Sequence, residues 1–229
     1  RRMLQDRFNL CRKSWLCCLT MLLAGIHSLL QAQEARFISF IRDTDLRHAV
    51  ACSPDGKHVY AGGERSLAVF RRSAADTLET IQVFNQGHLG VTAIEHIIDL
   101  AVSPDGRFVY AVNQGDRSLL LFARDSASGK IEFIERMIDD VLGGWPGAPN
   151  FYKLLLSDDG RHIYWLSMDY SKDDALIVFE RDSTSGRIKK VQVIKNYSLD
   201  LGGHKLPWWL DLSSDGRHVY AGGGNNDKL

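Results

Sequence analysis

Apolar residues come in short runs along most of the chain, and polar turn residues separate these runs. Residues 49–52, 59–61 and 67–70 are examples, with Asp, Gly, Pro and Ser frequent between them. Runs of this length, rich in Val, Tyr, Ile and Phe, predict β-strands rather than helices. No helix-period segment of useful length follows the first 32 residues, so the pattern predicts an all-β protein.

One turn recurs at a regular interval. Four Ser-x-Asp-Gly turns begin at Ser53, Ser103, Ser157 and Ser213, with spacings of 50, 54 and 56 residues. Asp bonds to the backbone that follows it and Gly accepts a positive φ, so each copy predicts a tight turn between two strands. Four short strands per repeat of about 50 residues are typical of a β-propeller blade.

We therefore expect an all-β fold, a β-propeller of four-stranded antiparallel blades, in residues 33–229. Blades are expected at about 47–84, 96–137, 151–194 and 208–229, the last incomplete, with an outer closing strand at 36–43. About three and a half blades fall short of the 4–8 that closed propellers use. Seven blades of this period need on the order of 370 residues. The sequence thus predicts part of a larger ring, whose missing blades come from the same gene product or from a second chain.

The first 32 residues have a different pattern. Basic residues up to Lys13 precede an apolar run at 15–26 and the small residue Ala32. This order predicts a secretory signal peptide in residues 1–32 and a periplasmic or secreted protein. The alternative is a membrane anchor, but the run is shorter than the roughly 20 residues that span a bilayer. Cleavage would leave no membrane span and a single cysteine, Cys52, which we expect to be a small buried hydrophobe.

Charge and motifs exclude several classes of function. The chain has 28 basic and 28 acidic side chains, without the surplus of Lys and Arg that phosphate binding needs, so we expect no nucleic-acid partner. It contains no His-Glu-x-x-His, P-loop, dinucleotide-binding or Gly-x-Ser-x-Gly motif. We therefore expect no metal and no cofactor.

Comparison of the repeats with one another separates scaffold positions from candidate site positions. On the first strand of each blade, alternate positions are uniformly apolar or small and suit packing between blades. The other face of these strands carries residues that break this uniformity: Asp99, Lys153, Trp209 and Asp211. Because the first strand of a propeller blade lines the central channel, these side chains are candidates for a ligand site.

The loops that enter these first strands form one rim of the channel. They hold further ionisable and aromatic side chains: His96, Trp145, Tyr152, His204, Lys205 and Trp208. Such a mixture is typical of a recognition surface. We therefore predict ligand binding by Asp99, Trp145, Tyr152, Trp208, Trp209 and Asp211.

The repeated motifs resemble a known family. Ser-Pro-Asp-Gly-x-x-Val-Tyr-Ala, followed by Leu-x-Val-Phe-x-Arg-Asp-x-x-x-Gly, is similar to the YVTN and lactonase-like group of seven-bladed propellers, especially its exported bacterial members. The resemblance covers residues 36–229. It implies the fold more strongly than an activity, because the repeated residues build blades and perform no chemistry.

Two functions remain open. We predict an exported lactonase-like propeller that binds a small molecule, glycan or protein at the channel rim. The alternative, which the resemblance implies, is hydrolysis of a sugar lactone, as in 6-phosphogluconolactonase-like proteins. Ring opening needs a base and donors to the developing oxyanion, roles that His96 or His204 and Lys153 or Lys205 can fill. The family's catalytic His, Arg and Glu are not matched here by motif.

Overall fold

The computed structural model describes seven stretches of the chain. All of them lie within the compact unit Ser39–Leu229. The predicted signal peptide, residues 1–32, and the predicted closing strand, residues 36–43, lie outside the described residues and stay predictions. The described stretches are 45–75, 77–87, 94–116, 118–137, 150–168, 175–195 and 209–222.

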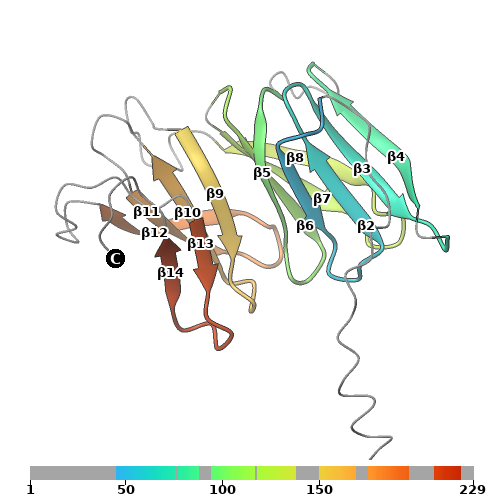
Figure 1. The fold of residues 1–229 in the computed structure, drawn as a ribbon. Helices are drawn as coiled ribbons and strands as arrows, with labels where there is room; N and C mark the ends of the chain where they lie inside the picture. Colours follow the sequence, from blue (N-terminus) through green and yellow to red (C-terminus); the bar gives the residue numbers. More distant parts are fainter. Residues whose placement is uncertain are drawn as a thin grey trace, which may run out of the picture. The chain divides into compact units, whose positions relative to one another are not determined.

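The described residues form antiparallel sheets that confirm the predicted all-β fold of four-stranded blades (Figure 1). Three sheets have four strands, each paired with the next in chain order, and β13 and β14 form a further pair. No helix among the described residues is long and apolar enough to cross a membrane. The strands are β1 (Ala49–Cys52), β2 (His58–Gly62), β3 (Ser66–Arg72), β4 (Leu78–Asn85), β5 (Ile97–Val102), β6 (Phe108–Asn113), β7 (Ser118–Arg124), β8 (Ile131–Met137), β9 (Asn150–Leu156), β10 (His162–Met168), β11 (Ala175–Arg181), β12 (Ile188–Lys195), β13 (Trp209–Leu212) and β14 (Val219–Gly222).

The Ser-x-Asp-Gly turns join the first and second strands of each blade, as predicted. In the first turn, Ser53 Oγ accepts a hydrogen bond from the backbone of His58 at 3.0 Å, and Asp55 accepts one from the backbone of Lys57 at 3.1 Å. Gly56 has a φ of +67°, which a residue without a Cβ adopts at little cost. The other three turns repeat this pattern, so the local sequence alone determines these hairpins.

Neighbouring blades pack through apolar side chains. Tyr60 and Phe84 of the first blade share a buried cluster with Phe122 of the second, and the Phe84 and Phe122 rings are 5.5 Å apart. Tyr110 of the second blade packs in the same way with Trp165 of the third. Each fully buried side chain of this size contributes roughly 1.5–3 kcal/mol, so the faces between blades are the core.

The inner strands β1, β5, β9 and β13 are neighbours in that order. Their pairing with the second strands fixes which residues lie at the same level: Ala49, Asp99, Lys153 and Trp209 pair with Gly62, Val112, Leu166 and Gly222. These partners hold equivalent positions in the four repeats. Asp99, Lys153 and Trp209 therefore lie at corresponding places on successive inner strands. This arrangement positions the candidate site.

Cys52 is exposed, so the prediction that it is buried was wrong. Val50, on the same face of β1, is 66% exposed, whereas Leu100 and Leu154 at the equivalent places on β5 and β9 are buried. Leu100 packs on the first blade and Leu154 on the second. The burial of this face therefore depends on a preceding blade, which the described residues do not supply for β1.

Candidate functional site

Asp99 joins the second and third blades along the inner strands. Its carboxylate accepts a hydrogen bond from the backbone N–H of Leu154 at 2.7 Å and another from Lys153 Nζ at 3.3 Å. Burial raises the pKa of Asp99, and the bonds from Leu154 and Lys153 oppose that rise. Asp99 thus fixes the spacing of two inner strands and orients the ammonium group of Lys153.

Lys153 keeps donor capacity beyond this contact. An ammonium group has three N–H donors, and among the described residues only Asp99 accepts one of them through a hydrogen bond or ion pair. The Lys153 side chain remains about one third exposed. It can therefore still donate to a bound anion or to a developing oxyanion.

Two histidines meet where β1 and β5 begin. His48 precedes β1, His96 precedes β5, and their ring centroids are 4.6 Å apart. His48 Nδ1 is buried, and no described group forms a hydrogen bond with it. Burial, followed by the charges of His96 and Arg47, lowers the pKa of His48 below its usual value of 6.5. A neutral imidazole carries a lone pair on one ring nitrogen and can therefore act as a proton acceptor.

The backbone around His96 explains how this pair forms. His96 has a φ of +63°, uncommon for a residue with a side chain, and the register of β5 shifts between Ile97 and Asp99. The His96 N–H donates to the carbonyl of Glu64 at 2.7 Å, and the Ile97 N–H donates to Gly63 at 2.8 Å. The start of β5 is therefore bonded to a turn of the first blade. This connection brings the His96 ring against His48.

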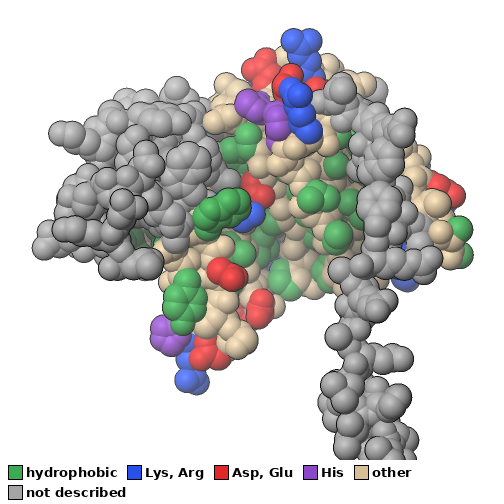
Figure 2. Space-filling model, in the orientation of Figure 1, with side chains coloured by type: hydrophobic (Ala, Val, Ile, Leu, Met, Phe, Trp, Pro, Cys, Tyr) green, Lys and Arg blue, Asp and Glu red, His purple; other side chains and the backbone are tan. Residues whose placement is uncertain are grey.

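Charged side chains surround the histidine pair. Arg47 forms an ion pair with Glu64, and Gln86 Nε2 donates to Glu95 at 2.7 Å. The Arg47 bond lowers the pKa of Glu64, which keeps this carboxylate ionised. Figure 2 shows histidine, basic and acidic side chains gathered at the upper edge of the face in view. The site therefore offers proton acceptors and both signs of charge close together.

Trp209 and Asp211 lie on the same face of β13, both exposed. Trp209 is 68% exposed, an unusual state for the largest apolar side chain. Asp211 accepts a hydrogen bond from the backbone of Leu212 at 2.9 Å. An exposed indole next to a carboxylate can bind a ring that carries hydroxyl groups.

The other predicted site residues are not placed by the structure. Trp145, His204, Lys205 and Trp208 lie outside the described residues, and for Tyr152 only the backbone, in β9, is described. Their roles stay predictions, as do the ligand-binding roles of Asp99, Trp209 and Asp211. Among the residues that are described, no group of three or more His, Cys, Asp or Glu side chains could hold a metal ion.

The sequence prediction missed His48. It lies five residues before Ser53, just as the predicted residues Tyr152 and Trp208 lie five residues before Ser157 and Ser213. This spacing could have indicated His48, because it places all three residues just before or at the start of an inner strand. The contact between His48 and His96 had no such signal, since it depends on the backbone of His96.

Comparison with known proteins identifies the family to which the chain is similar. Residues 30–196 match the family model described as "Lactonase, 7-bladed beta-propeller". The chain is 29% identical over 153 residues to a 6-phosphogluconolactonase of Bacillus subtilis, covering 66% of this chain and 41% of that protein. The chain therefore spans about two fifths of the length of this curated relative.

Solved structures agree on the fold. The periplasmic gluconolactonase PpgL of Pseudomonas aeruginosa has a TM-score of 0.50 and 29% identity, covering 66% of this chain and 39% of that one. A protein from Lactobacillus plantarum has a TM-score of 0.59 at 19% identity, covering 75% and 46%. The second similarity shows the fold alone, because its identity is low.

Proposed function

Since the chain belongs to the lactonase family of seven-bladed β-propellers, we propose that the protein hydrolyses a lactone ring at the end of the inner strands where His48 and His96 meet. One observation carries this proposal: the rings of His48 and His96 lie 4.6 Å apart where the inner strands begin, and burial lowers the pKa of His48, which favours its neutral form. Two relatives are named as lactonases of sugar acids, which supports a sugar lactone as the substrate class.

In the proposed reaction, His48 or His96 takes a proton from water, whose oxygen attacks the carbonyl carbon of the lactone. The carbonyl oxygen becomes an oxyanion, which Arg47 or Lys153 stabilises by donating hydrogen bonds. The tetrahedral intermediate then collapses and the ring C–O bond breaks. The imidazolium returns its proton to the leaving alkoxide, and the product is an open hydroxy acid.

Binding would use the inner strands. The exposed face of Trp209 offers apolar surface to a sugar ring, and Asp211 can accept hydrogen bonds from its hydroxyl groups. We also propose export to the periplasm or beyond, which the pattern of residues 1–32 supports.

A second candidate is a propeller that binds a sugar, peptide or small molecule without turnover. The bond between Lys153 and Asp99 favours it, because the ammonium is already partly neutralised and stabilises an oxyanion less well. The exposed Trp209 serves binding as well as catalysis.

Turnover separates the two functions. The purified full-length protein is assayed against a panel of aldonolactones, with loss of lactone measured beside the uncatalysed rate. Hydrolysis that falls at least about 100-fold in His48→Ala or His96→Ala supports the enzyme. His218→Ala is the matched control. This exposed histidine follows the turn after the last residue of β13, whereas the proposed site lies where the inner strands begin. Tight lactone binding with no turnover would support the second candidate, and turnover unaffected by either substitution would refute the proposed site.

A further inference from the structure

A buried histidine and a buried arginine meet where the first blade packs on the second. His58, the first residue of β2, is 1% exposed, and its Nδ1 lies 3.0 Å from Nη2 of Arg124, the last residue of β7. The Arg124 side chain is also 1% exposed. An arginine has only N–H donors and stays charged, so Nδ1 of His58 must accept this hydrogen bond. His58 is therefore neutral, with its proton on Nε2.

The rest of the guanidinium is bonded to both blades. Arg124 donates from Nε to the Tyr60 hydroxyl at 2.6 Å and from Nη1 to the Gly106 carbonyl at 2.8 Å. Its ion pair with Asp55 is long, at 3.5 Å. His58 is thus the closer of the two partners of Nη2, and its lone pair satisfies a buried donor of the arginine.

The interface between the second and third blades has a phenylalanine in this place. Phe108 corresponds to His58, because each stands five residues after the turn serine of its repeat. Arg181, the last residue of β11, lies over the Phe108 ring, 5.2 Å from its centroid, and pairs directly with Asp105 at 2.8 Å. Both interfaces therefore use the same arginine position, but the first places a titratable ring against it.

A turn glycine holds the His58 ring in this position. Gly129, between β7 and β8, lies so close that an added Cβ would overlap the ring. The Gly129 carbonyl accepts a hydrogen bond from the Tyr60 hydroxyl at 2.9 Å, which fixes the turn. A protonated His58 would therefore direct an N–H at a guanidinium that is itself a donor, in a buried place where neither charge is solvated.

The surroundings of His58 favour its neutral form. Burial lowers its pKa most and the charge of Arg124 lowers it further, whereas the charge of Asp55 raises it. The charged side chains on the elements packed against His58 are Asp55, Lys57, Arg71, Arg124, Asp125 and Lys130. Cations outnumber anions in this set, so uptake of a proton here is opposed by charge as well as by burial.

We propose that the contact between His58 and Arg124 is an acid-sensitive switch, which holds the first blade on the second at neutral pH and releases it when His58 takes up a proton. Protonation brings two cations into contact, so it is coupled to separation of the two side chains. The bonds of the Tyr60 hydroxyl to Arg124 and Gly129 join the same two blades and are weakened with it.

The same opening reaches the histidine pair. His48 precedes β1 of the first blade and His96 precedes β5 of the second, so release of the first blade parts their rings. This consequence for catalysis rests on the proposed function, whereas the switch itself does not.

The direction of the pH effect follows from the lowered pKa. An exposed histidine has a pKa of 6.5, so the opened interface binds a proton on His58 at a higher pH than the closed one. The stability of the interface is therefore complete above about pH 7 and falls as the pH drops below about 6.5. Asp55 stays ionised in this range, because the Ser53 hydrogen bond lowers its pKa to about 2.

Three amides report directly on this interface, because they belong to the second blade and bond to acceptors in the first. They are Ile131, bonded to Gln82 Oε1 at 2.8 Å, His96, bonded to the Glu64 carbonyl at 2.7 Å, and Ile97, bonded to the Gly63 carbonyl at 2.8 Å. The amide of Leu154, bonded to Asp99 at 2.7 Å, reports in the same way on the interface between the second and third blades.

Hydrogen exchange of these amides between pH 7 and pH 5 tests the proposal, with protection factors corrected for the intrinsic pH dependence of exchange. The 229-residue chain is compared with His58→Phe, which should fold because Phe108 fills the equivalent place beside its own turn glycine. We expect protection of the three amides to fall about 3-fold to 25-fold more in the wild type than in His58→Phe. The upper value is about the ceiling for a histidine whose pKa is 6.5 when exposed. The Leu154 amide should depend on pH equally in both chains.

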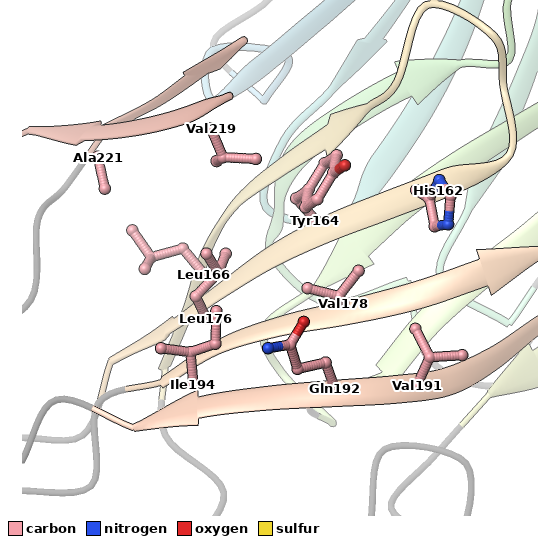
Figure 3. A pocket seen from close by; sticks show the side chains of 10 residues that line it. All are labelled: His162, Tyr164, Leu166, Leu176, Val178, Val191, Gln192, Ile194, Val219 and Ala221. Atoms are coloured by element: carbon pink, nitrogen blue, oxygen red, sulfur yellow. The ribbon is translucent and has the colours of Figure 1, made fainter. Parts of the chain in front are cut away.

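His162→Phe is the matched control. His162 holds the place of His58 in the third repeat, and Figure 3 shows it beside Tyr164 at one side of a groove. It is only partly buried, and among the described residues no arginine forms a hydrogen bond with it. The three amides should lose as much protection at pH 5 in His162→Phe as in the wild type. Phe108→His should transfer the effect, so that protection of the Leu154 amide falls more steeply below about pH 6.5 than in the wild type.

Equal losses of protection in the wild type and His58→Phe would overturn the proposal. A His58 imidazole that ¹⁵N NMR finds protonated at pH 7, or neutral with its proton on Nδ1, would overturn it as well. An excess loss that the Leu154 amide shares would overturn it in favour of a general loss of stability. These measurements use no lactone, so they decide the proposal even if the proposed hydrolysis fails.

Discussion

Tyr110→Phe removes one hydroxyl from the hydrogen bonds that join the second and third blades and leaves the ring in place. The Tyr110 side chain is fully buried, and its hydroxyl takes part in two short hydrogen bonds, one from Arg181 and one to Gly186. Burial raises the pKa of Tyr110 to about 12, so the group is a neutral donor at all ordinary pH values.

The cost follows from these two bonds. A hydrogen bond to a charged group contributes about 1.5–3 kcal/mol, a neutral one about 0.5–1.5 kcal/mol. The guanidinium of Arg181 keeps its bonds to Asp105 and Gly160, so the loss is not that of a whole buried ion pair. We expect Tyr110→Phe to lower the free energy of unfolding by about 2–4 kcal/mol.

Urea denaturation of the 229-residue chain measures this loss. With a slope of about 2–3 kcal/mol per molar urea, the midpoint should fall by about 1 M. Tyr220→Phe is the matched control, since Tyr220 holds the equivalent place in the fourth repeat and is 60% exposed. Its effect should be below about 0.5 kcal/mol. Equal effects of the two substitutions would refute the idea that the hydrogen bonds of Tyr110 to Arg181 and Gly186 stabilise the blades.

Three further results are expected. Gly186→Ala should destabilise the chain by about 1–3 kcal/mol more than Gly216→Ala in thermal unfolding, because both glycines have a positive φ but only Gly186 faces a ring; equal losses would contradict the close approach to Phe108. Asp99→Asn should cost about 1–2 kcal/mol less than Asp99→Ala in urea denaturation, since an amide oxygen still accepts the buried backbone bond; equal costs would show that the charge matters more than the bond. The Ser53 hydrogen bond lowers the pKa of Asp55 from 3.8 to about 2. The stability that this turn contributes should therefore be constant above about pH 4 and be lost between about pH 4 and 2. The free energy of unfolding, measured as a function of pH for the wild type and for Asp55→Asn, checks this.

The sequence predicted the blades because their hairpins are local. Each Ser-x-Asp-Gly turn forms its hydrogen bonds within six residues, so Ser53 and Gly56 determine the hairpin without help from other blades. Repeat comparison also singled out Asp99 and Lys153 as residues that do not belong to the uniform scaffold. The structure brings these two together across neighbouring strands.

The rest depends on contacts between blades, which no single repeat contains. Cys52 belongs to a face that is buried only when another blade covers it, and the repeat pattern does not indicate which blade has a neighbour. The pairing of His48 with His96 requires the positive φ of His96 and its bond to Glu64, a residue of another blade. His58 and Phe108 both stand five residues after a turn serine, but the reason that either ring suits this place, a turn glycine packed against it, is visible only in three dimensions.

The pH dependence of lactone opening tests the central claim most directly. Because burial, His96 and Arg47 lower the pKa of His48, kcat/KM of the full-length protein should rise with pH through an apparent pKa below 6.5 and level off near neutrality. His48→Ala should abolish this rise of kcat/KM with pH, while His218→Ala should keep it. If kcat/KM of His48→Ala rose with pH through the same apparent pKa and to the same plateau, this would contradict the assignment of the site to the histidine pair.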